Sequence, residues 1–454
     1  MALIDILKNL PEVKGPREKK LGFSTKLKWT LIILVGFFIL ESIPLFGLAE
    51  SALARFEYIA ILLGTSFGSI ISLGIGPIVM ASIILQLLVG AQILNIDLHS
   101  AEGKKYFQGL QKLLTLAFVI FESIVYVLMK GLEALPGMSF LVIFQLILGG
   151  LLIVFMDEVV QKWGFGSGVS LFIVAGIGLR LFAQLFQFLG TQNVFEPVGK
   201  VLALIASLIA GDMTGVTLSL ITILVTAALF FVVIWAQSLK VEIPLSFDRV
   251  RGYTIKWPLQ FFYAGVIPVI LVSALAANFQ LVATLIQNYL GHATFLGGFS
   301  QAQPISGFAF WIHSTPLLQA VITNSFRSIY ALQAAGHILF YTFFSILFAF
   351  FWINTSGMDA SSQAKNIMSS GLSIPGFRKD ERILESILKR YITPLTIMGG
   401  AAIGLLASVA NLLDAMVGGT AILLAVMILY QLYQNIAQQH ALDMNPALRG
   451  FFGG

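Results

Sequence analysis

The sequence predicts an all-α, polytopic membrane protein whose helices form two inverted, pseudo-symmetric halves of five. First, 57% of the 454 residues are hydrophobic, 11% are charged, and the mean hydropathy is +0.90, whereas soluble proteins carry about 25% charged residues. Second, long apolar runs recur along the whole chain. Third, Gly and Pro interrupt these runs at corresponding places in the two halves, which is typical of an inverted repeat around a central pathway.

Ten segments are each expected to form a transmembrane helix, because about 20 apolar residues are enough to cross a bilayer. They are residues 29–47, 74–92, 109–130, 138–157, 168–188, 214–238, 259–285, 334–355, 392–411 and 418–437. The first five make up a first half and the last five a second half, with a terminal segment at each end. The corresponding ranges are 29–190 and 191–437 for the halves, and 1–28 and 438–454 for the terminal segments.

The distribution of Lys and Arg predicts the orientation. With a cytoplasmic N-terminus, all but five of the 27 Lys and Arg residues lie in cytoplasmic segments. The five others are Arg55, Lys130, Arg180, Lys200 and Arg327. Because positive charge is enriched in cytoplasmic loops, both termini are expected in the cytoplasm.

Three cytoplasmic segments have further features. The loops 239–258 and 356–391 are long enough to project from the membrane and are basic. Such loops often serve only to fix orientation, so a docking role is one of two interpretations at this point. Near the N-terminus, Leu3, Leu7 and Leu10 lie on one helical stripe, which predicts an amphipathic segment on the membrane surface.

The interruptions lie in four of the predicted spans. The stretch GSIISLGIGPIVMASIILQLL, residues 68–88, places glycines and a proline directly before a run of aliphatic residues. The same order occurs in GFGSGVSLFI (164–173), AGVIPVI (264–270) and VGGTAILL (417–424). Small residues also allow transmembrane helices to pack closely. Four breaks that are paired by position favour a central pathway instead.

The residues after these breaks are aliphatic. Ile75 and Val79 are four residues apart, as are Val169 and Ile173, so each pair projects from one helix face. A carrier of ions or polar solutes normally has polar ligands at mid-membrane. Here Glu41 and Glu122 are acidic residues within the predicted spans, and neither lies on an interrupted helix. A constriction of bulky aliphatic side chains blocks ions by dewetting, while it can yield to something large.

The sequence gives no support for catalysis, nucleotide binding or metal binding. The chain has no Cys, no P-loop and no HExxH motif, and its five His residues show no metal-ligand spacing. The sequence therefore predicts neither an enzyme nor a bound cofactor.

Three motifs carry a resemblance to a known family. SIISLGIGPIVMASIILQLL, DEVVQKWGFGSGVSLFI and IPLSFDRVRG with KWPLQFFYAGVIPVIL together resemble the SecY family of protein-conducting channels, in its archaeal type. The resemblance covers nearly the whole chain. This sequence departs from the family pattern at Gln161, where a small polar residue is commoner.

The resemblance implies a ten-helix fold that is hinged between spans five and six, around an hourglass pore. A pore ring is implied at Ile75, Val79, Val169, Ile173, Ile270 and Leu424. A plug helix that closes the outer funnel is implied at about residues 55–66, with hinge glycines at Gly64, Gly68 and Gly74. These glycines would let the plug swing away while the spanning part of the helix stays fixed.

A lateral gate is implied between spans two and three on one side and spans seven and eight on the other. Its polar cluster would include Met80, Glu122 and Asn278. Because Met80 stands where a hydroxyl is common, the cluster is expected to be weaker than usual. For Asn278 alone, an interhelical hydrogen bond without a gating role is the alternative.

The resemblance also implies partners and a location. Arg249, Arg251 and Arg378 match the loop arginines with which the family docks its ribosome, and guanidinium groups suit ribosomal RNA phosphates. Implied partners are a small single-span SecE-type subunit, a peripheral beta-type subunit, the ribosome with a nascent chain and its signal sequence, the signal recognition particle receptor and the lipid bilayer. The implied location is the plasma membrane.

We therefore expect a passive channel that translocates secretory polypeptides and releases membrane segments laterally into lipid. The alternative is an inverted-repeat secondary transporter of small solutes. The pathway lining separates the two, because a carrier needs polar ligands at mid-membrane and a polypeptide pore needs an aliphatic ring.

Overall fold

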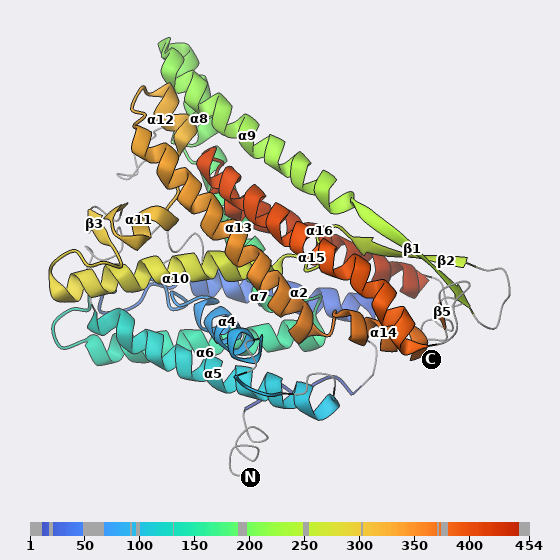
Figure 1. The fold of residues 1–454 in the computed structure, drawn as a ribbon. Coiled ribbons are helices and arrows are strands. Elements are labelled where there is room, and N and C mark those ends of the chain that lie inside the picture. Colours follow the sequence, from blue (N-terminus) through green and yellow to red (C-terminus); the bar gives the residue numbers. More distant parts are fainter. Residues whose placement is uncertain are drawn as a thin grey trace.

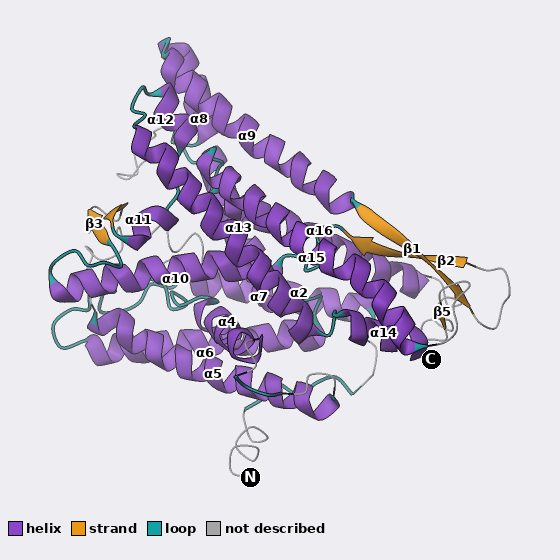
Figure 2. Cartoon of the chain, in the orientation of Figure 1, coloured by secondary structure: helices purple, strands orange, loops and turns teal. Residues whose placement is uncertain are grey.

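The fold of this chain is almost entirely helical, as the computed structural model shows (Figures 1 and 2). The structure describes residues 11–17, 21–48, 68–90, 93–96, 100–129, 131–188, 198–247, 254–300, 303–369, 372–373 and 380–444. The all-α class predicted from the sequence is confirmed. Two small groups of strands, which the sequence analysis did not predict, accompany the helices.

One helix lies in each of the ten predicted spans. They are α2 (Phe23–Ser42), α4 (Gly76–Gly90), α5 (Ala101–Leu128), α6 (Ser139–Trp163), α7 (Gly168–Phe186), α9 (Met213–Ser238), α10 (Ile267–Leu290), α13 (Ser328–Ser356), α15 (Glu381–Leu412) and α16 (Gly419–Met444). All but α4 belong to the nine segments of the described chain that are long and apolar enough to cross a membrane. With 15 residues, α4 is only about 22 Å long, because buried turns at 68–75 take the place of its first part.

The spanning helices form two groups that meet in the middle of the molecule. In one group, α6 packs against α2, α5 and α7, and α4 packs against α5. In the other group, α13 packs against α10 and α15, and α16 against α9 and α15. The groups meet where α4 packs against α10 and α13 and where α16 packs against α7. In Figure 1, α5, α6 and α10 run nearly horizontally, and α9, α13, α15 and α16 cross above them at a steep tilt.

Shorter elements lie between the spans. The helices are α8 (Lys200–Ala210), α11 (Phe308–Ile312), α12 (Leu317–Ile322) and α14 (Ala360–Ser369), and β3 (Gly298–Ser300) pairs with β4 (Gln303–Ser306). The hairpin of α8 and α9 turns at Gly211, which has a left-handed φ of 73°, and the Asp212 side chain accepts a hydrogen bond from the Thr214 amide. Helix α8 therefore lies in the connection between the fifth span, α7, and the sixth, α9.

A three-stranded sheet joins the two basic loops, which the sequence analysis treated separately. Strands β1 (Lys240–Phe247) and β2 (Thr254–Gln260) form an antiparallel pair, and β5 (Leu372–Ser373) pairs with the other edge of β1. Lys256 Nζ lies 2.9 Å from a carboxylate oxygen of Glu242, and this hydrogen-bonded ion pair lowers the pKa of that carboxyl. Loops 239–258 and 356–391 therefore form one structure.

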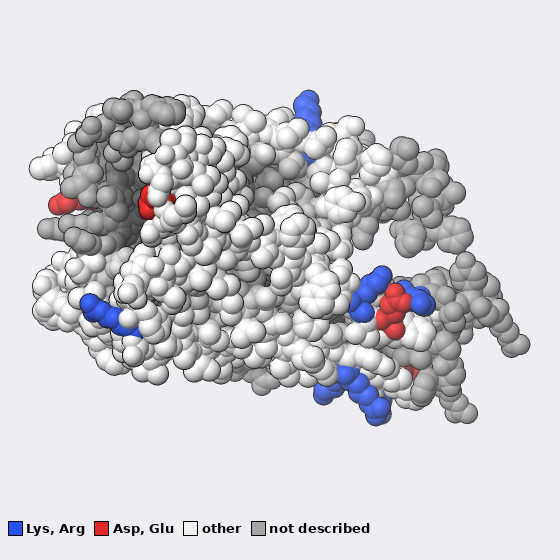
Figure 3. Space-filling view, turned by 90° about the horizontal axis from the view of Figure 1, so that it is seen from above, with Lys and Arg blue, Asp and Glu red and all other residues white. Residues whose placement is uncertain are grey.

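Charged side chains are sparse on the face shown in Figure 3, and a broad uncharged area occupies its centre. Most of the visible Lys and Arg side chains lie to the right, the side on which β1 and β2 project in Figure 1. A described part of the N-terminal segment binds the end of α6. Val13 donates its amide hydrogen to Glu158 Oε2 at 2.9 Å, and Trp163 Nε1 donates to the Lys14 carbonyl at 3.0 Å. The surface helix predicted from Leu3, Leu7 and Leu10 lies outside the described residues.

Close helix packing depends on glycine at a few positions. A Cβ added to Gly149 of α6 would lie 1.9 Å from the Ile70 carbonyl oxygen, in the turn that leads into α4. A Cβ added to Gly178 of α7 would meet nothing within 4 Å. Gly149 therefore sets how closely the turn before α4 approaches α6, whereas Gly178 is free of this constraint.

We expect Gly149→Ala to destabilise the protein by about 1–3 kcal/mol, because overpacking forces backbone shifts. Gly178→Ala is the matched control and should be neutral or stabilising, because Ala favours helix more than Gly does. Thermal unfolding in detergent measures both. Equal unfolding temperatures for the two variants would contradict the close approach.

Candidate functional site

The start of α4 is built from glycine turns. Gly68 and Gly74 have left-handed φ angles of 96° and 52°, which favour glycine over other residues. The Gly68 amide donates to Ser72 Oγ at 2.8 Å, and the Gly74 amide donates to the Ile71 carbonyl at 2.8 Å. Two of the three predicted hinge glycines thus have the backbone conformation of a turn. Gly64 and the predicted plug, residues 55–66, lie outside the described residues.

The start of α7 is held by a buried carboxylate. Asp157, near the end of α6, is 6% exposed, and its Oδ1 accepts a hydrogen bond from the Val169 amide at 3.0 Å. Its Oδ2 accepts another from Gln161 Nε2 at 2.7 Å. Because the first amides of a helix lack partners within the helix, Asp157 caps α7 from the neighbouring helix. Gln161, where this chain departs from the family pattern, holds the Asp157 carboxylate in place through this second hydrogen bond.

Sequence analysis missed the role of Asp157, which it left at the edge of a span. The sequence signal for this role is a carboxylate at the end of an apolar run, 12 residues before Val169, whose amide it binds. A Cβ on Gly168 would lie 2.6 Å from the Asp157 Cα. The glycine of the break therefore makes room for the capping residue.

The remaining two interrupted helices also begin after left-handed glycines. Gly265 has φ 66° before α10, which carries Pro268 in its first turn. Gly418 has φ 89° before α16. There, the Asn411 side chain of α15 accepts a hydrogen bond from the Thr420 amide at 2.8 Å. All four interruptions predicted from the sequence are thus ordered turns with partnered amides.

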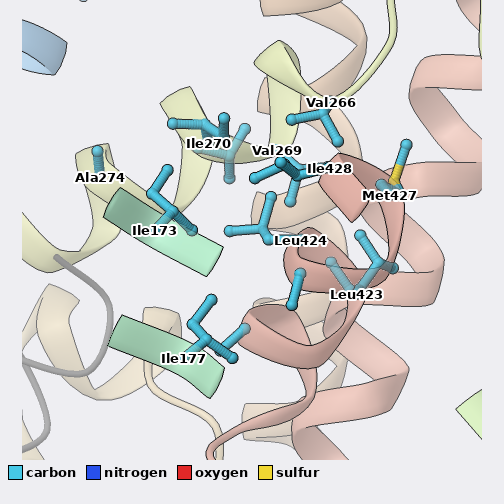
Figure 4. Close-up of a cluster of buried hydrophobic side chains, with 14 of the residues drawn as sticks. Ile173, Ile177, Val266, Val269, Ile270, Ala274, Leu423, Leu424, Met427 and Ile428 are labelled. Atoms are coloured by element: carbon cyan, nitrogen blue, oxygen red, sulfur yellow. The ribbon is translucent and has the colours of Figure 1, made fainter. Parts of the chain in front are cut away.

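The aliphatic residues after these turns converge on one buried cluster. Ile75, Val79, Ile173, Ile270 and Leu424 belong to it and are 2–5% exposed, and Val169 packs against it half-buried. Figure 4 shows Ile173 of α7 beside Ile270 of α10 and Leu424 of α16. The structure therefore places all six residues that were predicted as a ring in or against one buried cluster.

The predicted gate lies where α4 packs against α10 and α13. At the end of α4, a Cβ on Gly90 would come within 2.4 Å of the Phe351 ring of α13. Near the other end, Tyr126 of α5 and Leu281 and Leu285 of α10 share a second buried cluster. The helices on the two sides of the predicted gate thus pack against each other.

The three residues of the predicted polar cluster are not joined by hydrogen bonds in the described part of the chain. Asn278 Nδ2 donates to the Ala274 carbonyl of its own helix at 2.8 Å, and not to another helix as the alternative interpretation expected. Met80 is half-buried and packs against the large cluster, and Glu122 is buried on α5. The predicted docking arginines, Arg249, Arg251 and Arg378, lie outside the described residues, although the sheet that adjoins them is described.

Comparisons with known proteins agree on one family. A family model described as SecY matches residues 69–433. A protein translocase subunit SecY of Methanothermobacter thermautotrophicus is 44% identical over 451 residues, which cover 98% of this chain and 97% of that protein. The subunit of the same name from Methanocaldococcus jannaschii is 37% identical, covering 98% of each chain.

Solved structures give the same result. One described as "The structure of a protein conducting channel" has a TM-score of 0.84 and 36% identity, covering 98% of this chain and 99% of that chain. Canine Sec61, in a ribosome-channel complex from the endoplasmic reticulum, has a TM-score of 0.81 and 35% identity, with coverage of 98% and 99%.

We expect Asp157→Ala to lower the free energy of unfolding by about 0.5–2 kcal/mol, because it removes the cap of α7. Asp157→Asn keeps an oxygen that can accept from the Val169 amide, so it should retain most of the stability. Thermal unfolding of both variants in detergent compares them. If the Asn variant were as unstable as the Ala variant, the capping hydrogen bond would not be the cause.

Proposed function

The chain belongs to the SecY family, and from this we propose that it is the central pore-forming subunit of a protein-conducting channel. It translocates secretory polypeptides across the membrane and releases membrane-protein segments sideways into lipid. Its relatives are named as translocase subunits, and the solved structures that it resembles are protein-conducting channels. The family is one of channel subunits, so no catalytic residue or cofactor forms part of the proposal.

The observation that carries the mechanism is that six aliphatic residues, at or near the starts of the four interrupted helices, lie in or against one buried hydrophobic cluster. We propose that Ile75, Val79, Val169, Ile173, Ile270 and Leu424 form a ring that seals the idle pore. A narrow, purely apolar constriction excludes hydrated ions because it dewets. The same side chains have no fixed polar partners, so they can rearrange around an extended polypeptide.

This lining also bears on the alternative, a secondary transporter of small solutes. A carrier places polar or ionisable ligands at the point where its interrupted helices meet. The six proposed ring residues at that point are all aliphatic. Because the relatives are translocase subunits as well, the transporter alternative is not supported.

Opening is proposed to occur at the contact of α4 with α10 and α13. An apolar signal sequence that inserts there would replace helix–helix contacts by its own, and burial of its surface contributes roughly 25 cal/mol per Å². Met80, Glu122 and Asn278 would line this gate. The plug at residues 55–66 would then leave the outer side of the ring, turning about Gly64, Gly68 and Gly74.

The basic loops are proposed as the ribosome-docking surface. Canine Sec61, a structural relative, occurs in a ribosome-channel complex. In this chain β1, β2 and β5 join the two loops into one sheet, which supports a common docking surface. Arg249, Arg251 and Arg378 would bind RNA phosphates there, since a guanidinium group binds two phosphate oxygens at once.

The remaining partners follow from the family. They are a SecE-type single-span subunit, a peripheral beta-type subunit, a nascent chain with its signal sequence and the signal recognition particle receptor. The family and the apolar helices make the chain a multi-pass membrane protein. We propose the plasma membrane as its location and the cytoplasm for both termini, because this orientation places most Lys and Arg on the cytoplasmic side.

We expect Leu424→Gly and Ile173→Gly to raise the resting ion conductance of the reconstituted channel several-fold, because each opens the apolar seal to water. Val232→Gly on the exposed face of α9, 42% exposed, is a control that should leave conductance unchanged. Planar-bilayer recording measures the three variants. A tight resting channel with both ring substitutions would contradict the ring.

We expect Arg378→Glu to slow co-translational export and to weaken ribosome binding, because the new charge repels RNA phosphate. Lys389→Glu, on the nearby helix α15, is a charge-matched control with a weaker expected effect. Ribosome co-sedimentation and export of a reporter are the measurements, with thermal unfolding as a check on folding. Normal binding by the Arg378→Glu variant would count against its docking role.

A further inference from the structure

The turn between α15 and α16, residues 413–418, has a rare backbone conformation. Asp414 and Val417 have left-handed φ angles of 56° and 60°, although neither is glycine. For a β-branched residue such as Val417 this conformation is a true outlier, and it persists only where the surroundings impose it. Val417 and its neighbour Met416 are each 3% exposed and belong to the same buried cluster as the proposed ring.

Side chains from two other helices impose this conformation. The Val417 amide donates to Gln184 Oε1 of α7 at 2.8 Å, and the Met416 amide donates to Thr226 Oγ1 of α9 at 3.0 Å. Thr226 Oγ1 in turn donates to the Thr222 carbonyl of its own helix at 2.8 Å, which leaves its oxygen free to accept. Without these acceptors, both amides would be buried without partners, which is costly away from water.

The turn determines where α16 begins. A Cβ added to Gly419, the first residue of α16, would lie 2.0 Å from the Ala410 carbonyl carbon, so the helix start is pressed against α15. Leu424 lies five residues later on the same helix. A shift of the helix start by one residue would move Leu424 by about 1.5 Å and turn it by about 100°.

The acceptor on α7 and the ring residue on α7 belong to the same helix. Leu424 of α16 lies beside Ile173 of α7 in Figure 4, and α7 packs against α16. Gln184 is further along α7 and binds the turn that leads into α16. The hydrogen bond from Val417 to Gln184 thus ties the turn before α16 to the helix that carries Ile173.

We propose that Gln184 and Thr226 are positioning residues for the ring. By accepting hydrogen bonds from the Val417 and Met416 amides, they hold the turn 413–418 in its left-handed form and fix the register at which Leu424 meets Ile173. This inference rests on the proposed function of the ring. It assigns the tightness of the idle channel in part to two polar side chains that do not line the pore.

The test is the resting conductance of the reconstituted channel complex that carries Gln184→Leu together with Thr226→Val. These substitutions keep the size of the side chains and remove both acceptors. Loss of two hydrogen bonds should raise the open population and the resting conductance by about tenfold. Gln184 is exposed, so Gln184→Leu alone should fold normally and still leak measurably.

Three variants separate positioning from general destabilisation. Gln184→Glu keeps an acceptor oxygen and should retain a tight channel. Thr217→Val is the matched control for Thr226→Val, because Thr217 Oγ1 on α9 only donates to the Met213 carbonyl of its own helix. In the leaky double variant, Val417→Gly should restore closure, because glycine adopts the left-handed conformation without cost; Val417→Ala should not.

The outcomes distinguish this inference from the proposed function. The positioning role is supported if the variants without an acceptor leak and Gln184→Glu stays tight. It also requires that Val417→Gly closes the double variant and that Val417→Ala does not. A tight double variant alongside a leaking Leu424→Gly variant overturns the inference and leaves the ring intact. Equal effects of Val417→Gly and Val417→Ala also overturn it. A tight Leu424→Gly variant overturns the ring, and the inference with it.

Discussion

An interrupted transmembrane helix leaves backbone amides that hydrocarbon cannot satisfy, and the architecture of this protein depends on how those amides are partnered. Ser72 accepts from Gly68 before α4, and Asp157 accepts from Val169 at the start of α7. The Phe262 carbonyl accepts from Gly265 before α10, and Asn411 accepts from Thr420 in α16. Each break is therefore a fixed turn, and the residues that follow it have a fixed position.

This requirement explains why the aliphatic cluster lies deep within the protein. The six proposed ring residues lie at or near the starts of their helices, because Ile75 directly precedes α4, and Val169, Ile270 and Leu424 lie within six residues of the starts of α7, α10 and α16. In the proposed orientation, α4 and α16 run towards the cytoplasm while α7 and α10 run away from it. Helices that begin late from both faces have their first turns at mid-membrane, so one pattern of breaks in an inverted repeat suffices to place the residues together.

The sequence predicts those features that depend on local pattern, namely the apolar spans, the Gly and Pro breaks and the aliphatic residues after them. It does not show features that depend on a partner distant in the chain. The Asp157 cap joins two helices, and the sheet joins Ser246 to Ser373. Pro244 also argues against a strand in β1, because proline cannot donate to a neighbouring strand. Asn278 bonds within its own helix, a choice of partner that composition cannot indicate.

The sheet also changes how the two basic loops relate to the gate. Both loops connect helices of the second half, since one leads from α9 to α10 and the other from α13 to α15. The Tyr263 hydroxyl, just before α10, donates to the Met358 carbonyl, just after α13, at 2.7 Å. The start of α10, the end of α13 and the sheet are therefore one connected body. Because α10 and α13 form one side of the contact with α4, a partner bound to either loop acts on the same side of the proposed gate.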